Sequence, residues 1–192
     1  NKNTGFPWKK FPQYEALLHF AKGIGAGKIG DVETLSRSLL RLQELQQIFE
    51  SLVSGNYWVT QIEIQITTLK ALQFFAQNEK EKALETMKIA AELEDATEKG
   101  PVTPGHLLPV REMYGDMLLE MNNPTEALKQ YQLSLEKNPN RFNSLYGAGK
   151  SAELNGDMKT AKKYFSDLLK LNESVKSGRD QITYAENILK KI

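Results

Sequence analysis

An internal repeat constrains this chain more than any other feature of its sequence. The segment GDMLLEMNNPTEALKQYQLSLEKNPN aligns with GKSAELNGDMKTAKKYFSDLLKLNES when Gly115 is placed on Gly149. The matched positions are small or aromatic in both copies: Gly115 with Gly149, Ala127 with Ala161, and Tyr131 with Phe165. A period of about 34 residues arises where each unit stacks only on its neighbours. Repeats of this length are typically built from two helices. We therefore predict an all-α solenoid of antiparallel helix pairs without a sheet.

These positions resemble those of the tetratricopeptide repeat, which spans about 34 residues and two helices. In that family, small residues at positions eight and twenty let the two helices approach closely, and an aromatic at position twenty-four fills the adjoining space. A proline at position thirty-two ends the second helix. Pro139 stands there in the first copy, whereas Glu173 replaces it in the second. The resemblance implies a right-handed superhelix.

The repeat register predicts one domain over residues 1–192, with about nine helices. Clear repeats occupy 108–141 and 142–175, and looser copies occupy about 16–49 and 64–97. The loose copies place Gly23 and Ala71 at position eight. A capping helix is expected over about 176–192, where Ile182, Ala185, Leu189 and Ile192 share one face. Such a helix would cover the apolar surface of the last repeat.

The stretch GIGAGKIGD, from Gly23, contains the G-x-G-x-x-G spacing of dinucleotide-binding loops. Such a loop requires a strand before it and a helix after it. Here the preceding apolar residues fall at helical spacing: Tyr14, Leu17, Leu18, Ala21 and Ile24. A phosphate-binding P-loop also fails, because Ile29 follows Gly27-Lys28 in place of Ser or Thr. We interpret the glycines as helix-packing residues followed by a turn near Gly30.

Two longer stretches narrow the resemblance to one group within the tetratricopeptide family. EDATEKGPVTPGHLLPVREMYGDMLLEM, followed by NPNRFNSLYGAGKSAELNGD, is similar to the C-terminal part of a group of larger bacterial tetratricopeptide proteins. FPWKKFPQYEALLHFAKGIGAGKIGD fits the same group. The group brings no known activity. It implies that the native protein carries further helices upstream.

Composition excludes several classes of function. The chain has no cysteine, which removes disulfides, thiolate catalysis and cysteine-based metal sites. It has 25 basic and 24 acidic residues, a balance that calls for neither nucleic acid nor an anionic membrane. No apolar run approaches the ~18 residues of a membrane span, so we expect no membrane insertion. The bacterial cytoplasm and periplasm both stay open as compartments.

The inserted segment 96–106, ATEKGPVTPGH, is the longest irregular stretch. Ala83 and Ala127 hold the same repeat position but are further apart than one period, so about ten residues are inserted between them. Prolines and glycines punctuate the segment, which favours a stiff bridge between two halves of the solenoid. Alternatively, it forms a lip over the groove. His106 with Asp95 or Glu98 could there form a metal or small-molecule site.

Aromatic residues gather near the N-terminus: Phe6, Trp8, Phe11, Tyr14 and Phe20. The simplest interpretation is that they pack on the first repeat. Alternatively, they form a surface that upstream helices would cover, or a dimer contact.

The family resemblance also implies a ligand groove, lined by positions two, five, nine, twelve and thirteen of each first helix. Carried onto this sequence, these positions predict a partner-binding set: Gln65, Thr68, Phe75, Glu112, Asp116, Leu119, Asn143, Tyr146, Lys150 and Glu153. Some family members hold a terminal carboxylate with Lys and Asn at positions five and nine. Glu112 and Asp116 depart from that pattern, and the acidic pair predicts a preference for a basic ligand.

We expect a non-catalytic scaffold that binds a protein or peptide, with no cofactor, no metal and no nucleic acid. No catalytic constellation stands out in the sequence. The chain is expected to be a monomer or a weak homodimer. The alternative is a small-molecule or metal-binding protein, or an accessory part of a larger enzyme, with its site near the 96–106 loop.

Overall fold

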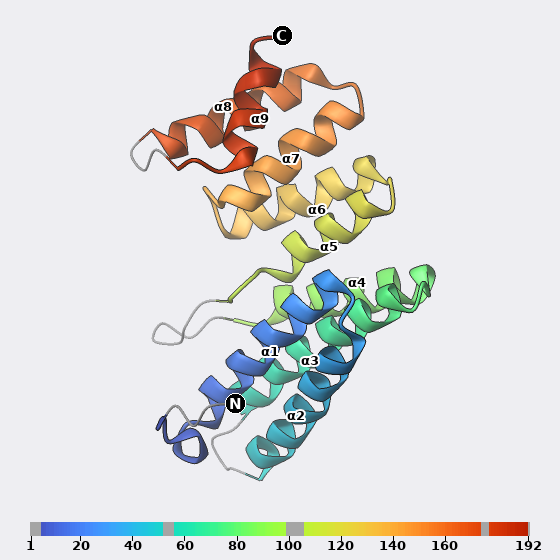
Figure 1. The fold of residues 1–192 in the computed structure, drawn as a ribbon, viewed down its shortest axis with the longest axis vertical. Helices are drawn as coiled ribbons and strands as arrows, with labels where there is room; N and C mark the ends of the chain where they lie inside the picture. The colour runs from blue at the N-terminus through green and yellow to red at the C-terminus, as the bar shows by residue number, and fades with distance from the viewer. Residues whose placement is uncertain (1–4, 52–55, 99–105, 174–176, 192) are drawn as a thin grey trace. The chain divides into compact units, whose positions relative to one another are not determined.

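The computed structural model describes residues 5–51, 56–98, 106–173 and 177–191. Over these ranges the chain forms nine α-helices and one short 3-10 helix, with no strand, which confirms the all-α prediction (Figure 1). The chain divides into two compact units, residues 1–107 and residues 108–192. The boundary falls at the end of the predicted insertion. The organisation of 1–192 as one domain stays a prediction.

Unit 1 contains the 3-10 helix η1 (Trp8–Lys10) and helices α1 (Pro12–Ile29), α2 (Val32–Glu50), α3 (Asn56–Ala76) and α4 (Lys80–Ala96). Each helix packs on the next, and α1 also packs on α3. Leucine and isoleucine side chains that are almost fully buried fill the interior: Leu35, Leu42, Leu45, Ile62 and Leu69. The predicted copies at 16–49 and 64–97 begin too late. Helix α1 already begins at Pro12 and α3 at Asn56.

The glycine stretch forms the last turns of α1, as the helix-packing interpretation requires. A Cβ at Gly23 would lie 2.4 Å from Leu69 Cδ1, so the glycine lets α3 approach α1 closely. Gly27 plays the same part against Leu72. Gly30 ends the helix in the left-handed conformation with φ of 74°. Asp31 then begins α2 by accepting a hydrogen bond from the Thr34 backbone N–H at 3.0 Å.

Unit 2 contains α5 (Val110–Glu120), α6 (Pro124–Lys137), α7 (Phe142–Leu154), α8 (Met158–Asn172) and α9 (Asp180–Leu189). Consecutive helices pack together, and α5 also contacts α7. Local signals set the boundaries. Asn123 caps α6, with Pro124 at its first position, and Asp157 caps α8 through the Thr160 backbone N–H.

The repeated small and aromatic residues meet each other in unit 2. A Cβ at Gly115 would lie 2.7 Å from the Tyr131 ring, and one at Gly149 would lie 2.7 Å from the Phe165 ring. Both rings are almost fully buried. The same contact therefore recurs one repeat later along the chain. Ala127 and Ala161 are also fully buried, as expected for residues at close helix contacts.

The last helix differs in detail from the predicted cap. α9 packs on α8 and buries Ile182, Ala185 and Ile188. The prediction placed Leu189 on this face, but Leu189 is only half-buried, and Ile188 takes its place. Ile192 lies outside the described residues.

Candidate functional site

The predicted groove residues of unit 1 are largely covered. Gln65 is 6% exposed and Thr68 is fully buried, with its hydroxyl donating to the Ile64 carbonyl at 2.8 Å. Phe75 is half-buried near the end of α3. Their part in ligand binding stays a prediction.

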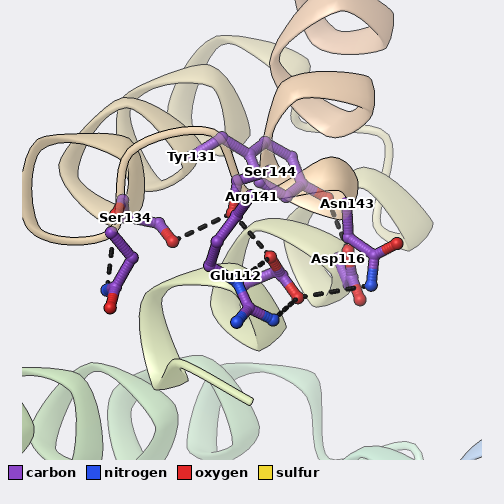
Figure 2. Close-up of polar contacts among 8 residues, drawn as sticks. Glu112, Asp116, Tyr131, Ser134, Arg141, Asn143 and Ser144 are labelled. Atoms are coloured by element: carbon purple, nitrogen blue, oxygen red, sulfur yellow. Dashed lines mark hydrogen bonds and ion pairs between the residues drawn. The ribbon is translucent and has the colours of Figure 1, made fainter. Parts of the chain in front are cut away.

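Glu112 on α5 is the centre of a buried polar network (Figure 2). Its side chain is 2% exposed. The Arg141 guanidinium donates to both of its carboxylate oxygens, from Nε at 3.0 Å and from Nη2 at 3.1 Å. The Ser144 hydroxyl donates at 2.6 Å, and the Asn143 amide reaches it at 3.4 Å. Since Arg141 directly precedes α7 and Ser144 lies in its first turn, the carboxylate ties α5 to α7.

This network decides the charge state of Glu112. Burial alone would raise the pKa of the carboxyl group, but the hydrogen bonds from Arg141 and Ser144 outweigh burial and lower the pKa below its usual value. The carboxylate is therefore ionised and neutralised by the neighbouring guanidinium. An ionised group with both oxygens occupied by internal donors serves the fold and leaves little capacity for a ligand.

Asp116, one turn further along α5, is also engaged inside unit 2. Its Oδ1 accepts a hydrogen bond from the Tyr131 hydroxyl at 2.7 Å, as Figure 2 shows. The predicted preference for a basic ligand assumed that Glu112 and Asp116 present two open negative charges. Arg141 neutralises Glu112, whereas the half-buried Asp116 accepts from a neutral phenol. A preference for a basic ligand therefore rests on Asp116 alone and stays a prediction.

A second cluster joins α7 to α9, and we call it the tyrosine cluster: Tyr146, Lys150, Glu153 and Tyr184. The Lys150 ammonium lies 3.2 Å from Glu153 and donates to the Tyr184 hydroxyl. That hydroxyl donates in turn to Glu153 Oε2 at 2.6 Å. The Tyr146 and Tyr184 rings meet edge to face, with centroids 5.9 Å apart. All four side chains are half-buried, so each keeps part of its surface open to solvent.

The electrostatics of the tyrosine cluster fix the protonation states of its lysine and of Tyr184. Burial alone would lower the pKa of Lys150, but its hydrogen bonds to Tyr184 and Glu153 raise it. Burial and the hydrogen bond to Glu153 raise the pKa of Tyr184. Lys150 therefore stays an ammonium and Tyr184 a neutral phenol at neutral pH. A nucleophilic lysine needs the opposite shift.

Tyr184 was absent from the predicted set, although a signal for it exists. It follows Lys150 by one full repeat period, so it occupies position nine of a third, truncated copy. Asp116, Lys150 and Tyr184 thus hold the same repeat position on three successive first helices. We predicted the last helix only as a cap, without extending the repeat register into it.

The two remaining predicted residues of unit 2, Asn143 and Leu119, flank these two groups, as does Leu154. Asn143 is exposed at the start of α7, beside Glu112. Leu119 is half-buried on α5. Leu154, at the end of α7, is 51% exposed and adds an apolar side chain next to Glu153.

The histidines have carboxylate neighbours. His106 Nδ1 lies 3.2 Å from Glu94, in place of the predicted partners Asp95 or Glu98, and both side chains are about nine-tenths buried. His19 lies 4.0 Å from Glu15, and burial lowers its pKa. Within the described part of the chain, no group of three or more His, Cys, Asp or Glu side chains could hold a metal ion. Residues 99–105 of the predicted loop site lie outside that part.

No helix in the described ranges combines the length and apolar character needed to cross a membrane.

No protein-family model matches the chain, and no curated protein matches it. Two solved structures of MamA are similar. The crystal structure of MamA protein has 14% identity and a TM-score of 0.49, over 85% of this chain and 96% of that one. MamA AMB-1 has 14% identity and a TM-score of 0.47, over 89% and 97%. Overlap at this level carries no argument about a partner or a site.

Proposed function

We propose that this chain is a non-catalytic scaffold that binds a protein segment, and that the tyrosine cluster is the centre of its contact surface. The observation that carries the proposal is the meeting of Tyr146 and Tyr184 on two first helices of the repeat array. Tyrosines with a buried ring edge and a polar tip are enriched at protein interfaces. Successive first helices also give an array an extended binding surface.

The polar groups of the cluster suit recognition of a polypeptide. Lys150 and Glu153 neutralise each other, so the cluster has no strong preference for the charge of a ligand. The exposed Asn143 side chain offers hydrogen-bonding groups, and Leu154 offers an apolar surface. Tyrosine is enriched at interface cores and among hot spots, so Tyr146 and Tyr184 are the anchors of the proposed surface.

Selection of peptides tests the proposal. Random dodecapeptides displayed on phage are selected against the immobilised chain, and the affinity of the selected peptides is measured by fluorescence anisotropy. The double variant Tyr146→Ala/Tyr184→Ala is expected to weaken binding by roughly tenfold or more, the usual effect of truncating aromatic hot spots. Urea unfolding of the variant separates loss of the surface from loss of the fold.

Leu133→Ala is the matched control. Leu133 is a 38% exposed apolar residue on α6, a second helix of the repeat array. This variant should bind the selected peptides as the unaltered chain does. The proposal is wrong if no peptide is selected, or if the tyrosine variant and the Leu133 variant bind equally well.

A further inference from the structure

An aromatic knob stands at the start of unit 1 and has no part in the proposed peptide surface. It consists of Phe6, Trp8, Phe11 and Tyr14, around η1 and the beginning of α1. The Phe6 ring lies at its centre, with centroids 4.4 Å from Trp8, 5.8 Å from Phe11 and 6.5 Å from Tyr14. Phe6, Phe11 and Tyr14 are 39%, 38% and 42% exposed. Phe20 is 4% exposed, as the prediction that these aromatics pack on the first repeat requires, and Trp8 is half-buried.

The charged side chains within residues 5–14 are of one sign. Lys9 and Lys10 are exposed on η1, between Trp8 and Phe11. Residues 5–14 contain no acidic side chain, and the first carboxylate after them, Glu15, pairs with Arg41 at 2.8 Å. Among the described residues, neither lysine forms an ion pair. The near-neutral balance of the whole chain thus conceals a locally cationic, aromatic segment.

We propose that this knob is a peripheral docking site for an anionic membrane surface. Tryptophan, tyrosine and phenylalanine rings settle at the boundary between headgroups and acyl chains, where an apolar body and a polar tip are both satisfied. Lysines beside them are attracted to anionic headgroups. The knob supplies both features on ten consecutive residues, and no membrane-spanning helix is required.

Charge and ring geometry separate this occupant from two others. A second copy of the knob would bring Lys9 and Lys10 against their own equivalents, which like charge opposes. A single-stranded nucleic acid needs open ring faces on which bases stack. Here the Phe6 ring already packs against three neighbouring rings. The rings therefore pack on one another and do not offer the open faces that bases need.

Vesicle binding tests the proposal. Co-sedimentation is measured with vesicles of phosphatidylcholine alone and with vesicles that also contain phosphatidylglycerol. We expect binding only to the anionic vesicles, and we expect salt to weaken it. Lys9→Ala/Lys10→Ala should lower the partition coefficient by about fivefold for each lysine. Phe6→Ala/Phe11→Ala should lower it by about tenfold or more.

A spectroscopic readout and a matched control complete the design. In a Trp58→Phe background, Trp8 is the remaining tryptophan, and its emission should shift to the blue with anionic vesicles. The control variant Leu40→Ala/Lys70→Ala removes one exposed leucine and one exposed lysine elsewhere in unit 1 and should partition normally. Equal binding to both vesicle types, no binding, or equal effects in knob and control variants would overturn the proposal. Self-association through the knob, or binding to an oligonucleotide in place of vesicles, would do the same.

Discussion

Replacing Gly147 by alanine should destabilise unit 2, because one buried ring occupies the space that a side chain would need. Tyr131 lies between Gly115 on α5 and Gly147 on α7. A Cβ at Gly147 would come within 2.3 Å of the ring, and one at Gly115 within 2.7 Å. The ring therefore cannot retreat from one helix without approaching the other. Its hydroxyl is also held by Asp116 at 2.7 Å.

The magnitude follows from two opposed effects. Carbon atoms pack comfortably at about 3.5 Å or more, so the ring would have to move by roughly 1 Å. Overpacking of this kind costs about 1–3 kcal/mol, and a fully enclosed ring places the cost near the upper end. Alanine in a helix is favoured over glycine by about 1 kcal/mol. Gly147→Ala should therefore lower the free energy of unfolding by roughly 2 kcal/mol.

Gly25 on α1 offers the opposite case, because nothing lies within 4 Å of a Cβ built there. Gly25→Ala should stabilise unit 1 by about 0.5–1 kcal/mol. Urea unfolding followed by far-ultraviolet circular dichroism measures both changes. In a Tyr131→Leu background, the cost of Gly147→Ala should largely disappear, since the ring that it strikes is gone. Equal signs for Gly25→Ala and Gly147→Ala, or an unchanged cost in that background, would refute the packing argument.

Two further predictions concern unit 2. Ala127→Leu and Ala161→Leu should each cost about 1–3 kcal/mol of stability in urea melts, whereas the same change at exposed Lys159 should do little; three equal results would show that the repeat register is wrong. Because the folded state lowers the pKa of Glu112, its carboxylate stabilises the fold above the ordinary glutamate pKa, and this stabilisation is lost as pH falls through the lower folded-state value. Glu112→Gln should therefore be less stable than the unaltered chain at pH 7 by about 1–3 kcal/mol, after allowance for the partly exposed Arg141. This difference in the free energy of unfolding should close in acid. A difference that is constant with pH would contradict the assignment.

The packing of unit 2 could be predicted because it depends on residue size at fixed spacing. A comparison of the sequence with itself, shifted by one repeat, directly pairs Gly115 with Gly149 and Tyr131 with Phe165. The size of these residues is visible in the sequence, and their contact needs only two adjacent helices. Gly23 and Gly27 of α1 were interpreted correctly as packing residues, since helical spacing before Gly25 left no strand for a nucleotide loop. Gly25 is the exception, because no neighbouring helix in the described part of the chain approaches it.

The site was less predictable, because it depends on which long side chains reach one another. Position five marks Glu112 as facing the groove, but the register gives no sign that Arg141, at the entry to α7, folds back onto it. An ion pair between residues so far apart in the chain, and not one period apart, leaves no periodic trace in a single sequence. Tyr184 did leave one, since it continues the series of Asp116 and Lys150.

Hydrogen–deuterium exchange of the chain with a phage-selected peptide tests the central claim most directly. If the first helices present the binding surface, the bound peptide should slow exchange across α7 and α9, around Tyr146, Lys150 and Tyr184. Protection should be weak on α6 and α8, and the Tyr146→Ala/Tyr184→Ala variant should lose it. Protection confined to α6 and α8, with α7 and α9 unchanged, would contradict the account.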